Sequence, residues 1–180
     1  ADILLLHFVG LGNLAVQPGQ PLVDVLEVLV RNVEPVVGLL QFEPCEAQLA
    51  VLPQDGNFEK VVIGADTVVY RNKLYGKPHD RADAIRILNE LNGKRHYVFT
   101  GVTVISKGIV RTFVVRSSVR FKSLSQEEIE RYVDEYRPYD KAGAYAVQEG
   151  VVVKSYRGSL TNIIGLPMEK LIKVLRNEEV

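Results

Sequence analysis

The chain has 180 residues, of which 47% are apolar, and its 22 Lys and Arg balance its 22 Asp and Glu. This length is enough for one domain with a sizeable core, or for two small lobes. A formal charge of zero gives no global reason to expect a nucleic-acid partner. A single Cys excludes an internal disulfide, and no apolar run approaches the roughly eighteen residues that span a bilayer. We therefore expect a cytoplasmic protein that is not inserted in a membrane.

The first third of the chain differs in composition from the rest. Residues 1–59 hold one basic residue, Arg31, against eight acidic ones, whereas residues 60–180 hold 21 basic against 14 acidic residues, a net charge of +7. Residues 1–59 also contain no Ser, Thr, Tyr or Lys, although Ser and Lys are among the commonest residues of soluble proteins. Two explanations stay open: an acidic segment that packs on a basic lobe, or a stretch that is not the natural sequence because of a shifted reading frame or a misassigned chain.

Strands and helices alternate along the chain, which predicts a mixed α/β fold with helices flanking a sheet, in a single domain over residues 1–180. The predicted strands are Ile3–Phe8, Val61–Ala65 continued by Val68–Tyr70, Lys73–Tyr75, Tyr97–Ile105, Ile109–Phe121 and Val151–Tyr156. The predicted helices are 21–32, a helix capped by Asp80 that stops at Asn92-Gly93, a helix with a Ser125–Glu128 capping box that reaches Tyr136, and a helix that starts at Pro167. Lys107-Gly108 would join the two long strands as a β-hairpin.

Asp66 is the most informative residue, because this carboxylate follows five small or apolar residues that should be buried. A buried charge is costly unless it is paired, hydrogen-bonded or bound to a metal. At the end of a central strand, and followed by the hydroxyl of Thr67, it occupies a usual position for a metal ligand or a general base. A carboxylate that only caps a neighbouring loop is the alternative, and the pattern does not decide between them.

Two further segments place cations beside small residues. Gly76-Lys77-Pro78 puts a cation on a rigid turn, and Asp140-Lys141 precedes small residues that let backbone approach a ligand, so that Lys141 can face phosphate oxygens. The alternative is a solvated lysine and a surface ion pair of little worth. Gln148 follows with an amide able to donate and accept toward a nucleobase edge. Residues 158–162 are either a polar loop at a cleft or a simple turn.

The histidines and the cysteine show no pattern of their own. His7, His79 and His96 lack metal-ligand spacing, and each is interpreted as a surface or core residue. Cys45 has no histidine or basic partner nearby in the sequence, which argues against a nucleophile. From the residues alone, one carboxylate, several cations and an amide suit a metal-assisted reaction on a phosphorylated small molecule.

Five segments together resemble the Maf family in their order and spacing, over residues 61–176. They are Ile63–Val69, Gly76–Pro78, His96–Val102, Asp140–Tyr145 and Ile164–Pro167. The resemblance implies a mixed α/β fold with two lobes around a deep cleft, as in inosine triphosphatases. It implies a nucleoside triphosphate pyrophosphatase that uses a divalent metal of the Mg²⁺ type, forms homodimers and removes non-standard nucleotides. Bacterial members are also linked to inhibition of septum formation.

The Gly64–Thr67 and Asp140–Tyr145 segments, followed by Gln148, resemble those of the subgroup of the family that acts on dTTP and UTP. Carried over by position, Asp66 matches the proton acceptor, and we expect it to serve as base, metal ligand or both. Thr67 and Gln148 match positions linked to base specificity, and two lysines match cations that face the triphosphate. The residues expected to bind substrate are Thr67, Lys77, Asp140, Lys141 and Gln148.

The first third departs from the family's pattern. Family members start with a strand and a Ser-x-Ser-Pro-Arg-Arg loop that grips the phosphates, whereas Val9–Asn13 carries neither a hydroxyl nor an arginine. Correct length with different content favours a compensated frameshift or a recording error, and a diverged protein without the phosphate grip is the alternative. A catalytically inactive, nucleotide-binding regulator is therefore the second functional hypothesis. A nucleic-acid-binding module ranks last, because the +7 charge is spread rather than clustered with aromatic residues.

Overall fold

The computed structural model describes residues 3–7, 61–106 and 109–176, and the statements below concern these residues. The predicted helix 21–32, the segment Val9–Asn13, Cys45 and the Lys107-Gly108 turn lie outside them. The strands are β1 (Ile3–His7), β2 (Val61–Arg71), β3 (Lys73–Tyr75), β4 (Arg95–Ser106), β5 (Ile109–Phe121) and β6 (Val153–Arg157). The helices are α3 (Arg81–Leu91), α4 (Gln126–Tyr136), α5 (Leu160–Ile164) and α6 (Met168–Leu175), with the 3₁₀ turns η1 (Ala142–Ala144) and η2 (Val147–Glu149).

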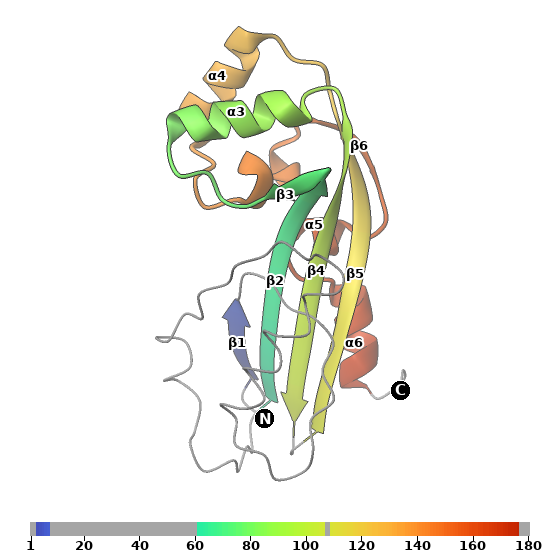
Figure 1. The fold of residues 1–180 in the computed structure, drawn as a ribbon. Coiled ribbons are helices and arrows are strands. Elements are labelled where there is room, and N and C mark those ends of the chain that lie inside the picture. The colour runs from blue at the N-terminus through green and yellow to red at the C-terminus, as the bar shows by residue number, and fades with distance from the viewer. Residues whose placement is uncertain (1–2, 8–60, 107–108, 177–180) are drawn as a thin grey trace. The chain divides into compact units, whose positions relative to one another are not determined.

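The strands form one mixed sheet in the order β1-β2-β4-β5-β6, with β3 paired to β2 outside this path (Figure 1). β1 runs parallel to β2, with Ile3 opposite Val61 and His7 opposite Ala65. β3 and β6 run antiparallel to β2 and β5. The sheet and its helices confirm the mixed α/β fold predicted from the sequence.

The chain divides into two compact units whose boundary falls between Asp66 and Thr67. The first comprises residues 1–66, 101–114 and 170–180, and the second comprises residues 67–100 and 115–169. In the first unit, Arg111 of β5 donates a hydrogen bond of 3.1 Å to the carbonyl of Val174 on α6. The second unit carries all five residues expected to bind substrate.

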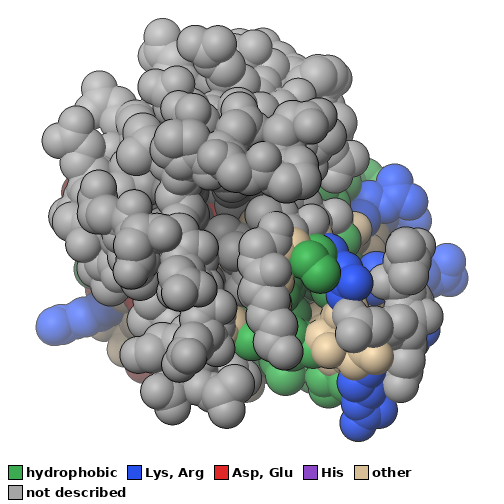
Figure 2. All heavy atoms as spheres, turned by 90° about the horizontal axis from the view of Figure 1, so that it is seen from below, with side chains coloured by type: hydrophobic (Ala, Val, Ile, Leu, Met, Phe, Trp, Pro, Cys, Tyr) green, Lys and Arg blue, Asp and Glu red, His purple; other side chains and the backbone are tan. Residues whose placement is uncertain are grey.

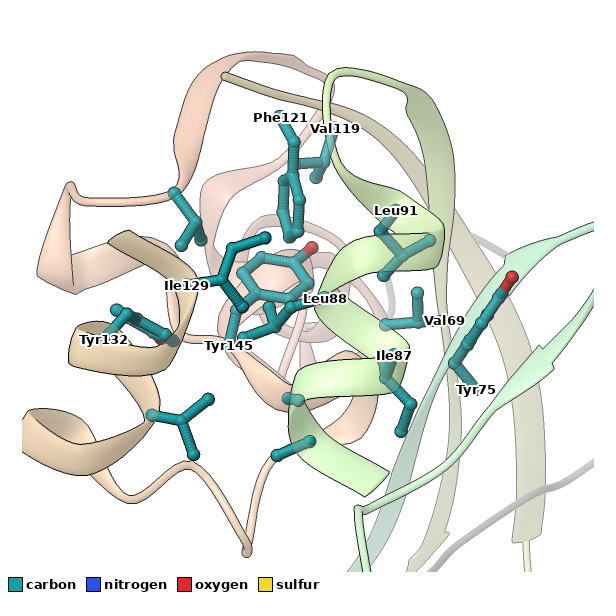
Figure 3. Close-up of a cluster of buried hydrophobic side chains, with 14 of the residues drawn as sticks. Val69, Tyr75, Ile87, Leu88, Leu91, Val119, Phe121, Ile129, Tyr132 and Tyr145 are labelled. Atoms are coloured by element: carbon teal, nitrogen blue, oxygen red, sulfur yellow. The ribbon is translucent and has the colours of Figure 1, made fainter. Parts of the chain in front are cut away.

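The second unit has a core to which α3 and α4 each contribute one buried face (Figure 3). α3 buries Ala84, Ile87, Leu88 and Leu91, the spacing of one helix face, and α4 buries Ile129, Tyr132 and Val133. Burying a side chain of the size of Leu or Ile contributes about 1.5–3 kcal/mol, so these faces are the main source of stability for both helices.

Both helices begin at the caps that the sequence predicts. The Asp80 carboxylate accepts a hydrogen bond of 2.8 Å from the backbone of Asp83. In the capping box of α4, the Ser125 hydroxyl accepts from the Glu128 backbone, and the Glu128 carboxylate accepts from the Ser125 backbone at 2.7 Å. Capping satisfies N–H groups that have no partner within the helix, which explains why these helix starts can be recognised from sequence.

Three details differ from the sequence predictions. Asp66 does not end a strand: β2 runs from Val61 to Arg71 through both polar residues, beside β4 in the sheet. β6 begins at Val153 rather than at Val151. Residues 158–162 are neither a cleft loop nor a simple turn, because the Ser159 hydroxyl accepts a 3.0 Å hydrogen bond from the Asn162 backbone and caps α5.

Two further observations concern long apolar helices and the surface. Within the described ranges, no helix has the length and apolar character needed to cross a membrane. Figure 2 shows Lys and Arg side chains at several separate places on the face seen there, beside hydrophobic ones.

Candidate functional site

Asp66 is a carboxylate in the interior, with only 3% of its surface exposed. It lies on β2 directly after the residues that pair with β1. Successive side chains of a strand point to opposite faces of the sheet, so Asp66 and Thr67 face opposite sides.

The Thr67 hydroxyl is part of a hydrogen-bond network on its own side of the sheet. Its Oγ1 lies 2.9 Å from Oγ1 of Thr100 and 3.4 Å from the Gly165 carbonyl oxygen. Thr100 donates its own proton to the Asn162 carbonyl at 3.0 Å, so Thr67 is the donor in the 2.9 Å bond. A hydroxyl has one proton, and only the lone pairs of Thr67 stay available to a ligand.

Asn162 anchors α5 to the sheet below this network. It is fully buried, and its amide donates to the Val98 carbonyl at 3.2 Å and to the Ser117 hydroxyl at 2.9 Å. The Ile164–Pro167 segment, which the sequence singles out, follows directly and meets Thr67 through Gly165. The network therefore connects the Ile63–Val69 segment to the Ile164–Pro167 segment.

The two cationic segments lie together, although they are far apart in the sequence. The Gly143 N–H donates to the Gly76 carbonyl at 3.0 Å, which joins the Asp140–Tyr145 motif to the Gly76–Pro78 turn. Lys141 donates to the Asp140 carboxylate at 2.9 Å. That bond, with a smaller contribution from the charge of Lys77, lowers the pKa of Asp140. The structure thus gathers two cations and one carboxylate in one place.

This junction depends on an unusual backbone at Gly143. Its φ is +73°, and the φ of the following Ala144 is +60°. A Cβ added to Gly143 would lie 3.0 Å from Cγ2 of Val69 and 3.3 Å from Cε1 of Tyr145. Glycine adopts the left-handed conformation at little cost, and its missing Cβ allows the close approach to β2.

Gln148 is exposed on η2, a turn that is held at both of its ends. At its start the Ala146 N–H donates to the Tyr132 hydroxyl at 3.3 Å, and at its end that hydroxyl donates to the Glu149 carboxylate while Lys122 donates to the Gly150 carbonyl at 2.9 Å. η2 also packs against α5. The amide of Gln148 is thus presented to solvent from a fixed turn, as a residue that contacts a ligand would be.

Two of the three histidines have side chains that the structure describes. His96 is fully buried in the core, and His79 is exposed, with its backbone N–H donating to Asp83 at 3.1 Å. Among the described residues, no group of three or more His, Cys, Asp or Glu could hold a metal ion. Mg²⁺ is commonly bound by one or two carboxylates together with substrate phosphates, so the buried carboxylate of Asp66 fits a metal that is shared with a nucleotide.

A pocket of about 350 Å³ lies along α4 and contains none of the residues expected from the sequence. Its lining includes Lys122, Arg131, Tyr132 and Tyr136. Two of these, Lys122 and Tyr132, are the residues that hold η2. Nothing in the sequence motifs points to this pocket.

A family profile described as "Maf-like protein" matches residues 35–178. The chain belongs to the Maf family. The match reaches further toward the N-terminus than the motifs over residues 61–176 do, and it includes part of the compositionally unusual first third.

Several curated relatives share substantial identity with this Maf-family chain. It is 35% identical to a "dTTP/UTP pyrophosphatase" of Bacillus anthracis over 159 residues, which are 83% of each chain. It is 47% identical to proteins of the same name from Thermosipho africanus, over 118 residues, and from Bacteroides thetaiotaomicron, over 121 residues. These two matches span 64% and 65% of this chain but 62% and 63% of those relatives.

Proposed function

We propose that this Maf-family chain is a nucleoside triphosphate pyrophosphatase that converts dTTP, UTP or modified pyrimidine nucleotides to the monophosphate and pyrophosphate. The observation that carries the proposal is the Gly143–Gly76 backbone bond, which gathers Lys77, Asp140 and Lys141 from two motifs. Two cations at one place are what a polyphosphate needs, because each can offset charge on its oxygens. The relatives named dTTP/UTP pyrophosphatase support the choice of substrate.

In the proposed reaction, a water molecule attacks the α-phosphorus, and the anhydride bond between the α- and β-phosphates breaks. Asp66 accepts the proton of that water, and pyrophosphate leaves with the electron pair of the broken bond. Lys77 and Lys141 stabilise the negative charge that develops on the leaving group. Asp66 would also hold a divalent metal, which we propose is Mg²⁺ and which offsets phosphate charge when it is bound.

Base recognition is proposed for Thr67 and Gln148. Because the Thr67 proton is engaged in the network with Thr100, Thr67 can only accept a hydrogen bond from a ligand. The imide N–H of thymine or uracil is such a donor, and cytosine lacks it at that position. Gln148 offers an exposed amide that can donate and accept. This donor–acceptor pattern favours dTTP and UTP over CTP.

The test is product analysis with dTTP and UTP, with CTP as the comparison. We expect the monophosphate and pyrophosphate in equal amounts, and we expect Lys141→Ala to raise the KM by about tenfold or more, since charge-assisted bonds contribute about 1.5–3 kcal/mol. Lys154→Ala is the matched control, because Lys154 is an exposed lysine on β6. Release of the nucleoside diphosphate and inorganic phosphate, or an equal effect of both substitutions, would refute the proposal.

A nucleotide-binding regulator linked to cell division is the second candidate. Val9–Asn13 favours it, because this segment lacks the hydroxyls and arginines of the family's phosphate loop. Nucleotide binding without turnover would support this candidate. Peptide mapping of residues 1–59 by mass spectrometry tests whether the protein carries the recorded sequence there. A Ser-x-Ser-Pro-Arg-Arg peptide would show that the protein has the phosphate loop, and peptides that match the recorded sequence would confirm that the loop is lost.

We also propose that the protein acts in the cytoplasm as a homodimer, as the family resemblance implies. Light scattering coupled to size-exclusion chromatography tests the assembly. A mass near twice the 20.1 kDa of the chain is expected, and a monomer would contradict it.

A further inference from the structure

Tyr145 ends the Asp140–Tyr145 motif and lies in the core of the second unit (Figure 3). Its ring meets Phe121 edge-on, with centroids 4.8 Å apart, and only 6% of the residue is exposed. Its hydroxyl lies 2.9 Å from Nε2 of His96. The proposed reaction assigns no role to either residue.

The His96–Tyr145 bond joins two polar groups inside an apolar core. His96 is fully buried, and its ring meets Phe121 and Tyr145 edge-on. Burial lowers the pKa of His96 to about 4, so the ring is neutral at physiological pH. Within the described part of the chain, Nδ1 of His96 has no hydrogen-bond partner, which makes the Tyr145 hydroxyl the polar contact that this side chain has there. A buried polar pair of this kind specifies one geometry, because the bond exists only when both rings are in place.

Tyr145 lies next to a turn with positive φ angles that also contacts Lys141. The ring approaches Gly143, since a Cβ there would lie 3.3 Å from Cε1 of Tyr145. Gly143 and Ala144 both have positive φ, and the Ala144 N–H donates to the Lys141 carbonyl at 3.0 Å. Residues in this region of the backbone persist only where the surroundings hold them. The Gly143 bond to Gly76 then holds the turn from its other side.

We propose that Tyr145 and His96 are positioning residues that hold the Gly143–Ala144 turn, and thereby keep Lys141 beside the Gly76–Lys77 turn for substrate. The effect on substrate rests on the proposed function, whereas the effect on the turn does not. Neither residue touches substrate in this account. Both act through Lys141.

The first experiment measures the turn directly, by amide hydrogen exchange at Gly143 in the whole protein. Tyr145→Phe keeps the ring and removes the bond to His96. We expect the exchange of the Gly143 amide to rise about tenfold. The control is Ile87→Val on α3, a buried apolar site in the same core, which lowers stability without touching a polar group. Unchanged exchange at Gly143, or the same rise in the control, would overturn the proposal.

The second experiment is a double-mutant cycle on dTTP turnover. Tyr145→Phe should raise the KM about two- to tenfold, the ratio that corresponds to the net worth of one hydrogen bond, with a smaller change in kcat. In a Lys141→Ala background the same substitution should have no further effect on the KM. An undiminished effect in that background would show that the pair does not act through Lys141. If the wild-type protein does not hydrolyse dTTP, the proposed function fails, and the exchange measurement still decides the positioning role.

Discussion

Substitution of Gly143 by Ala should destabilise the protein more than a glycine-to-alanine change at an equally left-handed but open position. Gly143 has a φ of +73°, and its added Cβ would meet Val69 at 3.0 and 3.2 Å and Tyr145 at 3.3 Å. Gly150 has a φ of +67°, and an added Cβ there would meet nothing within 4 Å. The two positions share the backbone cost and differ in the contacts.

The magnitudes follow from these two terms. A left-handed conformation costs an L-residue about 1–2 kcal/mol, and this cost applies at both positions. Overpacking a tight site typically costs about 1–3 kcal/mol more, and this cost applies at Gly143 alone. Alanine also restricts the conformations of the unfolded chain, which stabilises both variants by about 0.4–1 kcal/mol and offsets part of the loss. We expect a loss of about 2–4 kcal/mol for Gly143→Ala and about 1 kcal/mol or less for Gly150→Ala.

Urea unfolding of the two variants and the wild type measures the difference. With a slope of about 2 kcal/mol per molar urea, the midpoint of Gly143→Ala should lie about 1 M below that of Gly150→Ala. Val69→Ala should relieve part of the clash, so its effect combined with Gly143→Ala should be less than additive. Equal midpoints for the two glycine variants would refute the close approach of the turn to β2.

Three further predictions concern stability. Ser125→Ala removes the α4 cap and should cost about 1 kcal/mol, seen as a fall of about 2–4 °C in Tm; an unchanged Tm would contradict the capping box. Thr100→Val removes two hydrogen bonds of the network and should cost about 1–3 kcal/mol in urea unfolding, whereas a neutral effect would mean that the network does not hold α5. The hydrogen bond from Lys73 lowers the pKa of Glu90 from 4.5 to about 2, so its stabilisation is complete above pH 4.5 and is lost as the pH falls through about 2. This partly exposed pair contributes less than about 1 kcal/mol to the free energy of unfolding. Glu90→Gln should reduce the loss of stability at low pH by that amount.

The helices and strands of residues 61–176 could largely be predicted from sequence because their signals are local. The start of α4 is an example, since Ser125 and Glu128 satisfy each other's backbone groups within one turn. α5 escaped prediction because five residues show no helical period, and only the capping hydroxyl of Ser159 indicates it. Asp66 was misplaced at the end of a strand because β2 continues to Arg71 beside β4, a long-range neighbour that spacing does not reveal.

The candidate site could be predicted as a set of residues but not as an arrangement. The motifs identified Lys77 and Lys141, yet the Gly143–Gly76 bond that brings them together is a long-range contact. The opposite orientation of Asp66 and Thr67 follows from β2 running unbroken through both residues. His96 was interpreted as a surface or core residue, and its bond to Tyr145 could not be foreseen, because no local pattern pairs the two.

The most direct test of the account is Mg²⁺-dependent release of pyrophosphate from dTTP by the wild-type protein and by Asp66→Asn. If Asp66 is the general base, kcat should fall about 10²–10⁴-fold, while the urea midpoint and nucleotide binding show that the variant is folded. Pyrophosphate release that survives the substitution in a folded variant would contradict the central role of Asp66.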